Sequence, residues 1–317
     1  MKVVFDTNVY LDLTRGLDCT GVGHLASHLR GKEALKGYQA LACPIVMWEL
    51  LAHLCDPSDP RRDACVRAVT LLAIHCRTPG ENARLDVAAP LDAEICRVVF
   101  HKEIDGLKDL ILGLGQVCEG VADIYLSTGS ESTAATGCHT GSAETLATLL
   151  ASNEERFKEM FKSDVLTVDP RGGGTRITTT PDRGTPNFLK DIRSDSMLPN
   201  LALKLAVSMA DALGEQLSEQ QARTYARQIA KLFPVPLQIL RELWERVATN
   251  EFDIDHPKKQ RGNFHWDMNI AAIASGVIGG QPVLLVTSDR AIIKACTHAG
   301  YGDNVMETAA YRDLICL

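Results

Sequence analysis

The sequence lacks the features that mark several classes of protein. Its 317 residues are 45% hydrophobic and 23% charged, which is the composition of neither a disordered chain nor collagen. It also lacks an excess of positive charge, because 33 Lys and Arg stand against 40 Asp and Glu. The net charge of −7 argues against a protein that coats DNA or an anionic membrane, but it does not exclude a local nucleic-acid site.

The sequence lacks a long uninterrupted apolar run of the kind that marks a membrane or secretory segment. The apolar stretch near the C-terminus, Ile270 to Val286, is broken by three glycines and a proline, which predicts helix, turn and strand. A signal peptide would need its apolar run where the N-terminus carries Asp6. We therefore expect a cytoplasmic protein that makes no membrane contact.

Cysteine pairs of the kind found in zinc sites and redox motifs are missing. The ten cysteines are irregularly spaced and form no Cys-x-x-Cys motif. Several lie in apolar segments, where cysteine behaves as a small hydrophobic residue. The spacing therefore supports neither a disulfide framework nor a zinc site.

Short runs with the composition of strands occur near both ends of the chain. They are Lys2–Phe5, Cys43–Met47, Pro282–Thr287 and, less clearly, Asn304–Glu307. A helical pattern follows the second run, and another follows the third. Strands that alternate with helices predict an α/β fold with a parallel sheet between two layers of helices.

The middle of the chain, residues 91–260, shows helical patterns and no convincing strand. Capping boxes that begin at Ser152 and Ser218 predict two helix starts, and a further helix is expected at Leu237–Ala248 after two prolines. Residues 169–186 are rich in turn formers and predict a surface loop. We interpret this region as a helical insertion.

The charge divides in the same way. Residues 91–260 contain 19 Lys and Arg against 25 Asp and Glu, a net charge of −6. Residues 1–90 and 261–317 together contain 14 against 15, a net charge of −1, and have the combined size of one domain. We expect these two segments to form a split core. The acidic insertion favours a role in regulation or in binding a protein partner or inhibitor over RNA contact.

Four carboxylates stand at the edges of the predicted strand and helix units: Asp6, Glu49, Asp267 and Asp289. Above the carboxyl ends of parallel strands they would converge, and like charges in close proximity require a neutralising cation. Oxygen ligands without His or Cys suit Mg²⁺ or Mn²⁺. Such a site fits metal-assisted hydrolysis of a phosphodiester bond.

These acids and their surroundings resemble the PIN-domain nucleases. The resemblance rests on Val4–Val9, Ile45–Leu50, Asp267–Ala274 and Leu285–Asp289, and it covers about the first 60 and last 60 residues. It implies a Rossmann-like, three-layer core. It also implies an endonuclease, most often of single-stranded RNA, in which the four acids are the catalytic ligands of Mg²⁺ or Mn²⁺.

The resemblance also assigns supporting roles. Residues beside the first and last acids would orient the ligands: Thr7, Asn8, Thr287 and Ser288. Basic residues of the near-neutral core are candidates for contacts with RNA phosphates: Arg61, Arg62 and Arg67. Members of the family often form homodimers, so a homodimer is a further expectation.

Several alternatives remain open at this stage. Asp6 and Asp289 suit helix N-caps, and Asp267 suits the first turn of a helix. A haloacid dehalogenase-type phosphatase would use Asp6 as its nucleophile, although Asn8 stands where that chemistry wants a second acid. A catalytically silent PIN-like module that binds a protein is another alternative. RNA or single-stranded DNA as substrate, and a toxin–antitoxin, phage-defence or RNA-processing setting, are equally open.

Overall fold

The computed structural model describes residues 1–80, 83–137, 159, 162, 165–168, 175–182, 185–252, 264–276 and 282–317. Its central feature is a parallel sheet of four strands in the order β2-β1-β5-β6. The strands are β1 (Lys2–Phe5), β2 (Gln39–Ala40), β5 (Val283–Val286) and β6 (Val305–Met306). The first and third predicted strands, β1 and β5, pair directly in the middle of the sheet, with Phe5 opposite Val286.

The two central strands are apolar along their length because both faces of the sheet are covered. The last three residues of β1 and all four of β5 are buried. Continuous runs of branched apolar residues are typical of such strands. The predicted mixed α/β core with a parallel sheet is therefore confirmed. The fourth predicted strand is also present, shortened to β6.

The predicted strand at Cys43–Met47 is wrong. These residues lead into α3 (Pro44–Cys55), and the strand is the short β2 that precedes them. Pro44 occupies the first turn of the helix, a position that proline favours. Because α3 is buried on most sides, its apolar run at Ile45–Met47 has no helical periodicity that would distinguish it from a strand.

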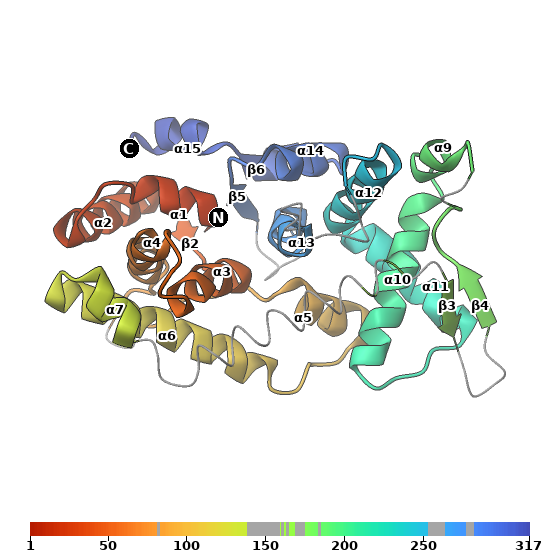
Figure 1. The fold of residues 1–317 in the computed structure, drawn as a ribbon, viewed down its shortest axis with the longest axis horizontal. Helices are drawn as coiled ribbons and strands as arrows, with labels where there is room; N and C mark the ends of the chain where they lie inside the picture. The colour runs from red at the N-terminus through yellow and green to blue at the C-terminus, as the bar shows by residue number, and fades with distance from the viewer. Residues whose placement is uncertain are drawn as a thin grey trace.

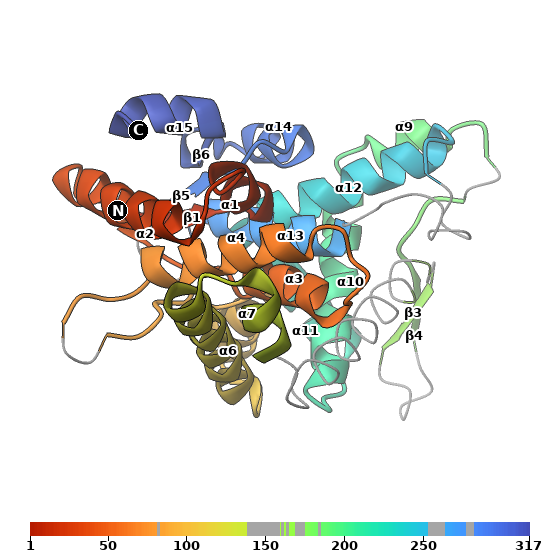
Figure 2. The same ribbon diagram turned by 60° about the vertical axis from the view of Figure 1, so that its left-hand side comes forward.

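Helices surround the sheet. Those of the N-terminal part are α1 (Thr7–Leu13), α2 (Cys19–Leu35), α3 and α4 (Arg62–His75). Those after β5 are α14 (Arg290–His298), the short 3₁₀ turn η6 (Gly302–Asn304) and α15 (Thr308–Ile315). Both ribbon views place α15, at the C-terminal end, beside α1 and α2 (Figures 1 and 2).

A buried polar network joins these two ends of the chain. The Glu33 carboxylate lies 2.8 Å from His75 Nε2 and accepts a hydrogen bond of 2.6 Å from the Tyr311 hydroxyl. Burial alone would lower the pKa of His75, but the charge of Glu33 and hydrogen bonds to Cys76 and Glu33 raise it to about 10. The charged pair therefore joins α2 to α4, and the Tyr311 hydroxyl joins α15 to the same carboxylate.

The middle of the chain is largely helical. Its first part contains α5 (Leu91–Ile95), the π-helical turn η1 (Cys96–Phe100), α6 (Leu107–Thr128) and α7 (Glu131–Gly137). Its second part contains α9 (Phe188–Ile192), α10 (Met197–Ala212), α11 (Glu219–Leu232) and α12 (Pro234–Ala248). Then follow α13 (Phe264–Ala272) and the 3₁₀ turn η4 (Ile273–Ser275). In both views α6 and α7 lie against the N-terminal helices, far from α9.

The expectation that residues 91–260 contain no strand is wrong. β3 (Val165–Val168) and β4 (Thr175–Thr178) form an antiparallel pair. Each run has only four residues, and the turn formers around them dominated the pattern. The capping box at Ser218 is confirmed at the start of α11, but Pro234 begins α12 instead of preceding it. The predicted capping box at Ser152 lies outside the described residues.

Helix α6 was overlooked as an apolar segment. Its length and hydropathy would allow it to cross a membrane, but core helices of soluble proteins have the same length and hydropathy. One face of α6 is buried, including Cys118, Val121 and Tyr125, and the helix packs against α4 and α7. A soluble protein is consistent with this packing.

Candidate functional site

The carboxyl ends of β1 and β5 bring the first and last of the predicted acids together. Asp6 directly follows β1, and its backbone N–H donates to the Val286 carbonyl at 3.0 Å, which continues the pairing of the two strands. Asp289 lies three residues after the end of β5. Two acids that are far apart in the sequence therefore leave the same edge of the sheet.

Thr287 connects these two acids. Its hydroxyl donates to Asp6 Oδ2 at 2.8 Å and accepts from the backbone N–H of Asp289 at 3.0 Å. The other oxygen of Asp6 accepts from the N–H of Thr7 at 2.6 Å. Asp6 is 4% exposed, so these hydrogen bonds replace water around its carboxylate.

Glu49 reaches the cluster from a helix. The Thr7 hydroxyl donates to Glu49 Oε2 at 2.6 Å. The expectation that Glu49 stands at the edge of a strand and helix unit is wrong, because it lies inside α3. The helix nevertheless directs this carboxylate to the start of α1, beside Asp6.

Asp267 lies in the first turn of α13, as one of the alternatives expected. Burial, together with the charges of Asp289, Asp6 and Glu49, raises its pKa to about 8, whereas Arg246 opposes the shift. The pKa of Asp6 is raised to about 6, mainly by burial, with contributions from Glu49 and Asp289. The four predicted acids are therefore near enough to repel one another.

Two of the acids are also helix N-caps. Asp6 caps α1, and Asp289 caps α14 by accepting from the N–H groups of Ala291 and Ile292 at 2.7 and 3.2 Å. Both hydrogen bonds to Asp289 end on Oδ1. The capping alternative is confirmed for both residues, and it fixes the orientation of their carboxylates. At Asp289 neither capping bond ends on Oδ2.

The supporting residues fall into two groups. Thr7 and Thr287 contact the acids directly. Asn8 is exposed and has no hydrogen bond to an acid in the described part of the chain. The Ser288 hydroxyl is 2.8 Å from the hydroxyl of Thr308 at the start of α15.

The three candidate arginines lie along the start of α4. Arg61 is exposed and lies 3.2 Å from the imidazole of His53. Arg62 donates to the Leu54 carbonyl at 3.2 Å. Arg67 forms an ion pair of 2.9 Å with Glu131 on α7. Of the three, Arg61 is the most accessible to a phosphate.

The acids match a hard cation in donor chemistry. As the side chains are placed, no three Asp, Glu, His or Cys groups of the described residues are close enough to hold one metal ion. The cluster nonetheless offers carboxylate and hydroxyl oxygens only, the donors that Mg²⁺ and Mn²⁺ prefer. Its mutual repulsion is the property that a divalent cation would relieve.

Sequence reasoning missed an aromatic pair next to the acids. Trp48 precedes Glu49, Trp266 precedes Asp267, and the two rings lie 6.1 Å apart. Both line a cavity of about 300 Å³ between α3, α10 and α13. The only signal in the sequence was that each tryptophan adjoins a predicted site residue.

Comparisons with known proteins add no relative. No protein-family model, no curated protein and no solved structure matches this chain. The resemblance to PIN-domain nucleases therefore stays a prediction that rests on the residues described above.

Proposed function

We propose that this protein is a metal-dependent endonuclease with a PIN-like core, and that it hydrolyses phosphodiester bonds of single-stranded RNA. One observation carries the proposal. Four acids from four separate segments lie so near one another that Asp267 is influenced by the other three, with pKa values of about 6 for Asp6 and about 8 for Asp267. A protein tolerates such repulsion where function requires it.

In this proposal Asp6, Glu49 and Asp267 hold Mg²⁺ or Mn²⁺, and Asp289 adds a ligand directly or through water. When bound, the ion lowers the pKa of water and neutralises the charge that develops on the phosphate. The hydroxyls of Thr7 and Thr287 orient two of the carboxylates by the hydrogen bonds already described. Arg61, which is exposed on the start of α4, is the candidate for contact with the RNA backbone.

The test is cleavage of labelled single-stranded RNA and DNA by the full chain, with Mn²⁺, with Mg²⁺ or with excess chelator. We expect cleavage of RNA that needs the ion and is abolished in Asp6→Asn and Asp267→Asn. Asp12→Asn is a matched control, because Asp12 lies on the exposed side of α1 and pairs with Arg15. Each variant is checked for folding by circular dichroism.

Three outcomes would contradict the proposal. Full activity of the Asp6 or Asp267 variants would remove the acids from the mechanism. Absence of Mn²⁺ binding and of cleavage would favour a silent protein-binding module. A phosphorylated Asp6, trapped with a phosphate monoester, would favour the phosphatase alternative.

A further inference from the structure

An irregular segment extends the sheet beyond β2. The N–H of Ala42 donates to the Asp86 carbonyl at 2.8 Å, and the N–H of Ala88 donates to the Ala42 carbonyl at 2.8 Å. These bonds form a parallel bridge between Ala42 and Val87. The N–H of Asp86 donates to the Cys76 carbonyl at 2.9 Å on the same side. Residues 84–89 are therefore the outermost extended segment at this end of the sheet.

The other side of this segment has no partner strand among the described residues. In an extended chain, successive residues direct their backbone groups to opposite sides. Because Asp86 and Ala88 bond inward, Leu85, Val87 and Ala89 direct their N–H and C=O groups outward. None of these three residues has a backbone hydrogen bond to another described residue. Such a row of unpaired donors and acceptors is a template for an added strand.

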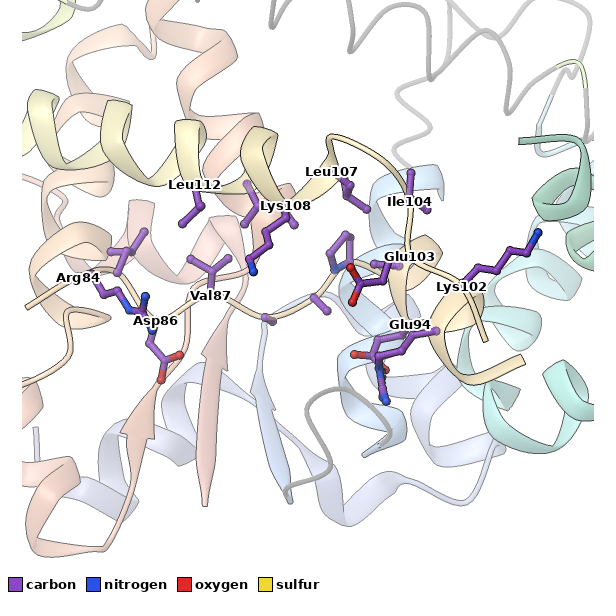
Figure 3. Close-up of a pocket in the computed structure, with 17 residues that line it drawn as sticks. Arg84, Asp86, Val87, Glu94, Lys102, Glu103, Ile104, Leu107, Lys108 and Leu112 are labelled. Carbon is purple, nitrogen blue, oxygen red and sulfur yellow. Dashed lines mark hydrogen bonds and ion pairs between the residues drawn. The ribbon is translucent and has the colours of Figure 1, made fainter. Parts of the chain in front are cut away.

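A groove runs along this unpaired edge. It has a volume of about 390 Å³ and separates residues 84–90 from the first half of α6. In Figure 3, Lys108 and Leu112 extend from α6 toward the segment that carries Val87. Leu85, Val87 and Leu112 contribute apolar surface to the lining. An extended chain in this groove would have the edge on one side and the helix on the other.

The charges around the groove are not all paired. Asp86 pairs with Lys2, and Lys102 pairs with Glu215. Arg84, Lys108 and Glu103 form no ion pair with any described residue. Figure 3 shows Arg84 and Lys108 on either side of Val87, and Glu103 beyond Lys108. The two cations beside Val87 complement a ligand that places a carboxylate at this end of the groove.

We propose that this groove binds an extended peptide segment of a protein partner. The peptide adds to Leu85–Ala89 as an outer strand, places apolar side chains against Val87 and Leu112, and places an acidic side chain or a C-terminal carboxylate at Arg84 and Lys108. The outward backbone groups favour a peptide over a fatty acid as the ligand, because only a peptide has the N–H and C=O groups to pair with them. A fatty acid would fill the groove but would leave every outward N–H and C=O unpaired. The site is independent of the four acids proposed for catalysis.

The test uses a displayed library of random heptapeptides selected on the full chain. A selected peptide is then synthesised with a fluorophore, and its affinity is measured by fluorescence polarisation. Val87→Pro removes the outward N–H but leaves the inward bonds of Asp86 and Ala88 in place. We expect this variant to weaken binding at least about tenfold. Lys108→Glu should weaken it several-fold, whereas Lys190→Glu on α9, an exposed lysine outside the groove, should not change it.

Hydrogen exchange of the wild-type chain is the second measurement. It tests the proposal even if Val87→Pro does not fold, because it does not use the variant. Bound peptide should slow exchange of the Leu85 and Val87 amides. The proposal is overturned if the library yields no binder, if binding leaves these two amides unchanged, or if a folded Val87→Pro binds equally well. It is also overturned if dodecanoate displaces the peptide and itself slows the exchange of no amide. A dimer detected by light scattering, with this edge as its interface, would overturn it as well.

Discussion

The hydroxyl of Thr7 donates a 2.6 Å hydrogen bond to the carboxylate of Glu49. Because Thr7 directly follows Asp6, this bond connects two of the four acids. This bond crosses from the start of α1 to the middle of α3. It gives Glu49 one orientation, directed to the carboxyl end of β1. Glu49 therefore joins the cluster at the edge of the sheet from the middle of a helix, whereas Asp6 follows a strand directly.

Thr7→Val tests this contact. The variant keeps the shape of the side chain and removes the donor, so Glu49 loses its orientation. We expect RNA cleavage to fall about tenfold or more, as is usual when a group that orients a metal ligand is removed. Thr7→Ser keeps the hydroxyl and should retain most activity. Equal rates for Thr7→Val and the wild type, measured with saturating Mn²⁺, would show that the bond has no part in catalysis.

Asp267→Asn should stabilise the metal-free fold while it abolishes cleavage. The pKa of Asp267 is raised to about 8 in the fold, from an ordinary value near 3.8. Between these pH values the unfolded chain has already lost the proton that the folded chain retains, so stability falls as the pH rises. The variant should therefore match the wild type near pH 4 and exceed it above pH 8 by on the order of 1–3 kcal/mol.

Thermal unfolding in chelator at several pH values measures this difference. Asp6→Asn should show the same trend over a narrower range, because the pKa of Asp6 is raised only to about 6. A difference that does not depend on pH would mean that repulsion among the acids does not limit stability.

Binding of Mn²⁺ should strengthen as the pH rises from 6 to 8. At pH 6 the carboxyl of Asp267 is mostly protonated and that of Asp6 about half protonated, and a ligand must lose its proton to bind the ion. We expect the affinity to rise on the order of tenfold to a hundredfold over this range. Calorimetric titration in two buffers of different ionisation enthalpy also measures the protons released. Constant affinity with no proton release would contradict ligation by these acids.

Glu33→Gln should destabilise the protein without affecting the site directly. The change leaves His75 buried without its charged partner, which costs about 3 kcal/mol in comparable pairs. Tyr311→Phe removes one hydrogen bond to the same carboxylate and should cost about 1–2 kcal/mol. Urea denaturation measures both. If the two variants are equally stable, the charge of the pair contributes nothing beyond the hydrogen bond.

The same pair predicts a loss of stability in alkali. The pKa of His75 is raised to about 10, above its unfolded value of 6.5, so its contribution is complete below pH 6.5 and lost as the pH rises through 10. Glu33→Gln should therefore show a weaker pH dependence than the wild type over this range. Parallel pH curves would contradict this assignment.

Local pattern predicted the centre of the sheet because β1 and β5 are short buried runs followed by polar residues. Parallel pairing of those strands was enough to bring Asp6 and Asp289 to one edge. Glu49 was included from its place in the helical pattern that follows the apolar run at Cys43–Met47. That run was predicted as a strand, because a helix buried on most sides shows the same unbroken apolar run as a buried strand.

The rest of the site depends on contacts between distant segments. The bond between Thr7 and Glu49 requires α3 to pack beside α1, and nothing in either segment specifies that approach. The influence of Arg246 on Asp267 likewise comes from the packing of α12 against α13. The β3 and β4 pair was missed because four-residue strands within a turn-rich segment carry little pattern of their own.

The pairing of β1 with β5 has a consequence for synthesis of the chain. Asp6 is synthesised 281 residues before Thr287, and β1 is synthesised long before its partner strand β5. During translation the N-terminal helices have time to form, whereas β1 has no neighbour on one side until Val283–Val286 leaves the ribosome. The acid cluster therefore assembles only after Thr287 and Asp289 have left the ribosome, and until then Asp6 lacks the hydrogen bond from the Thr287 hydroxyl.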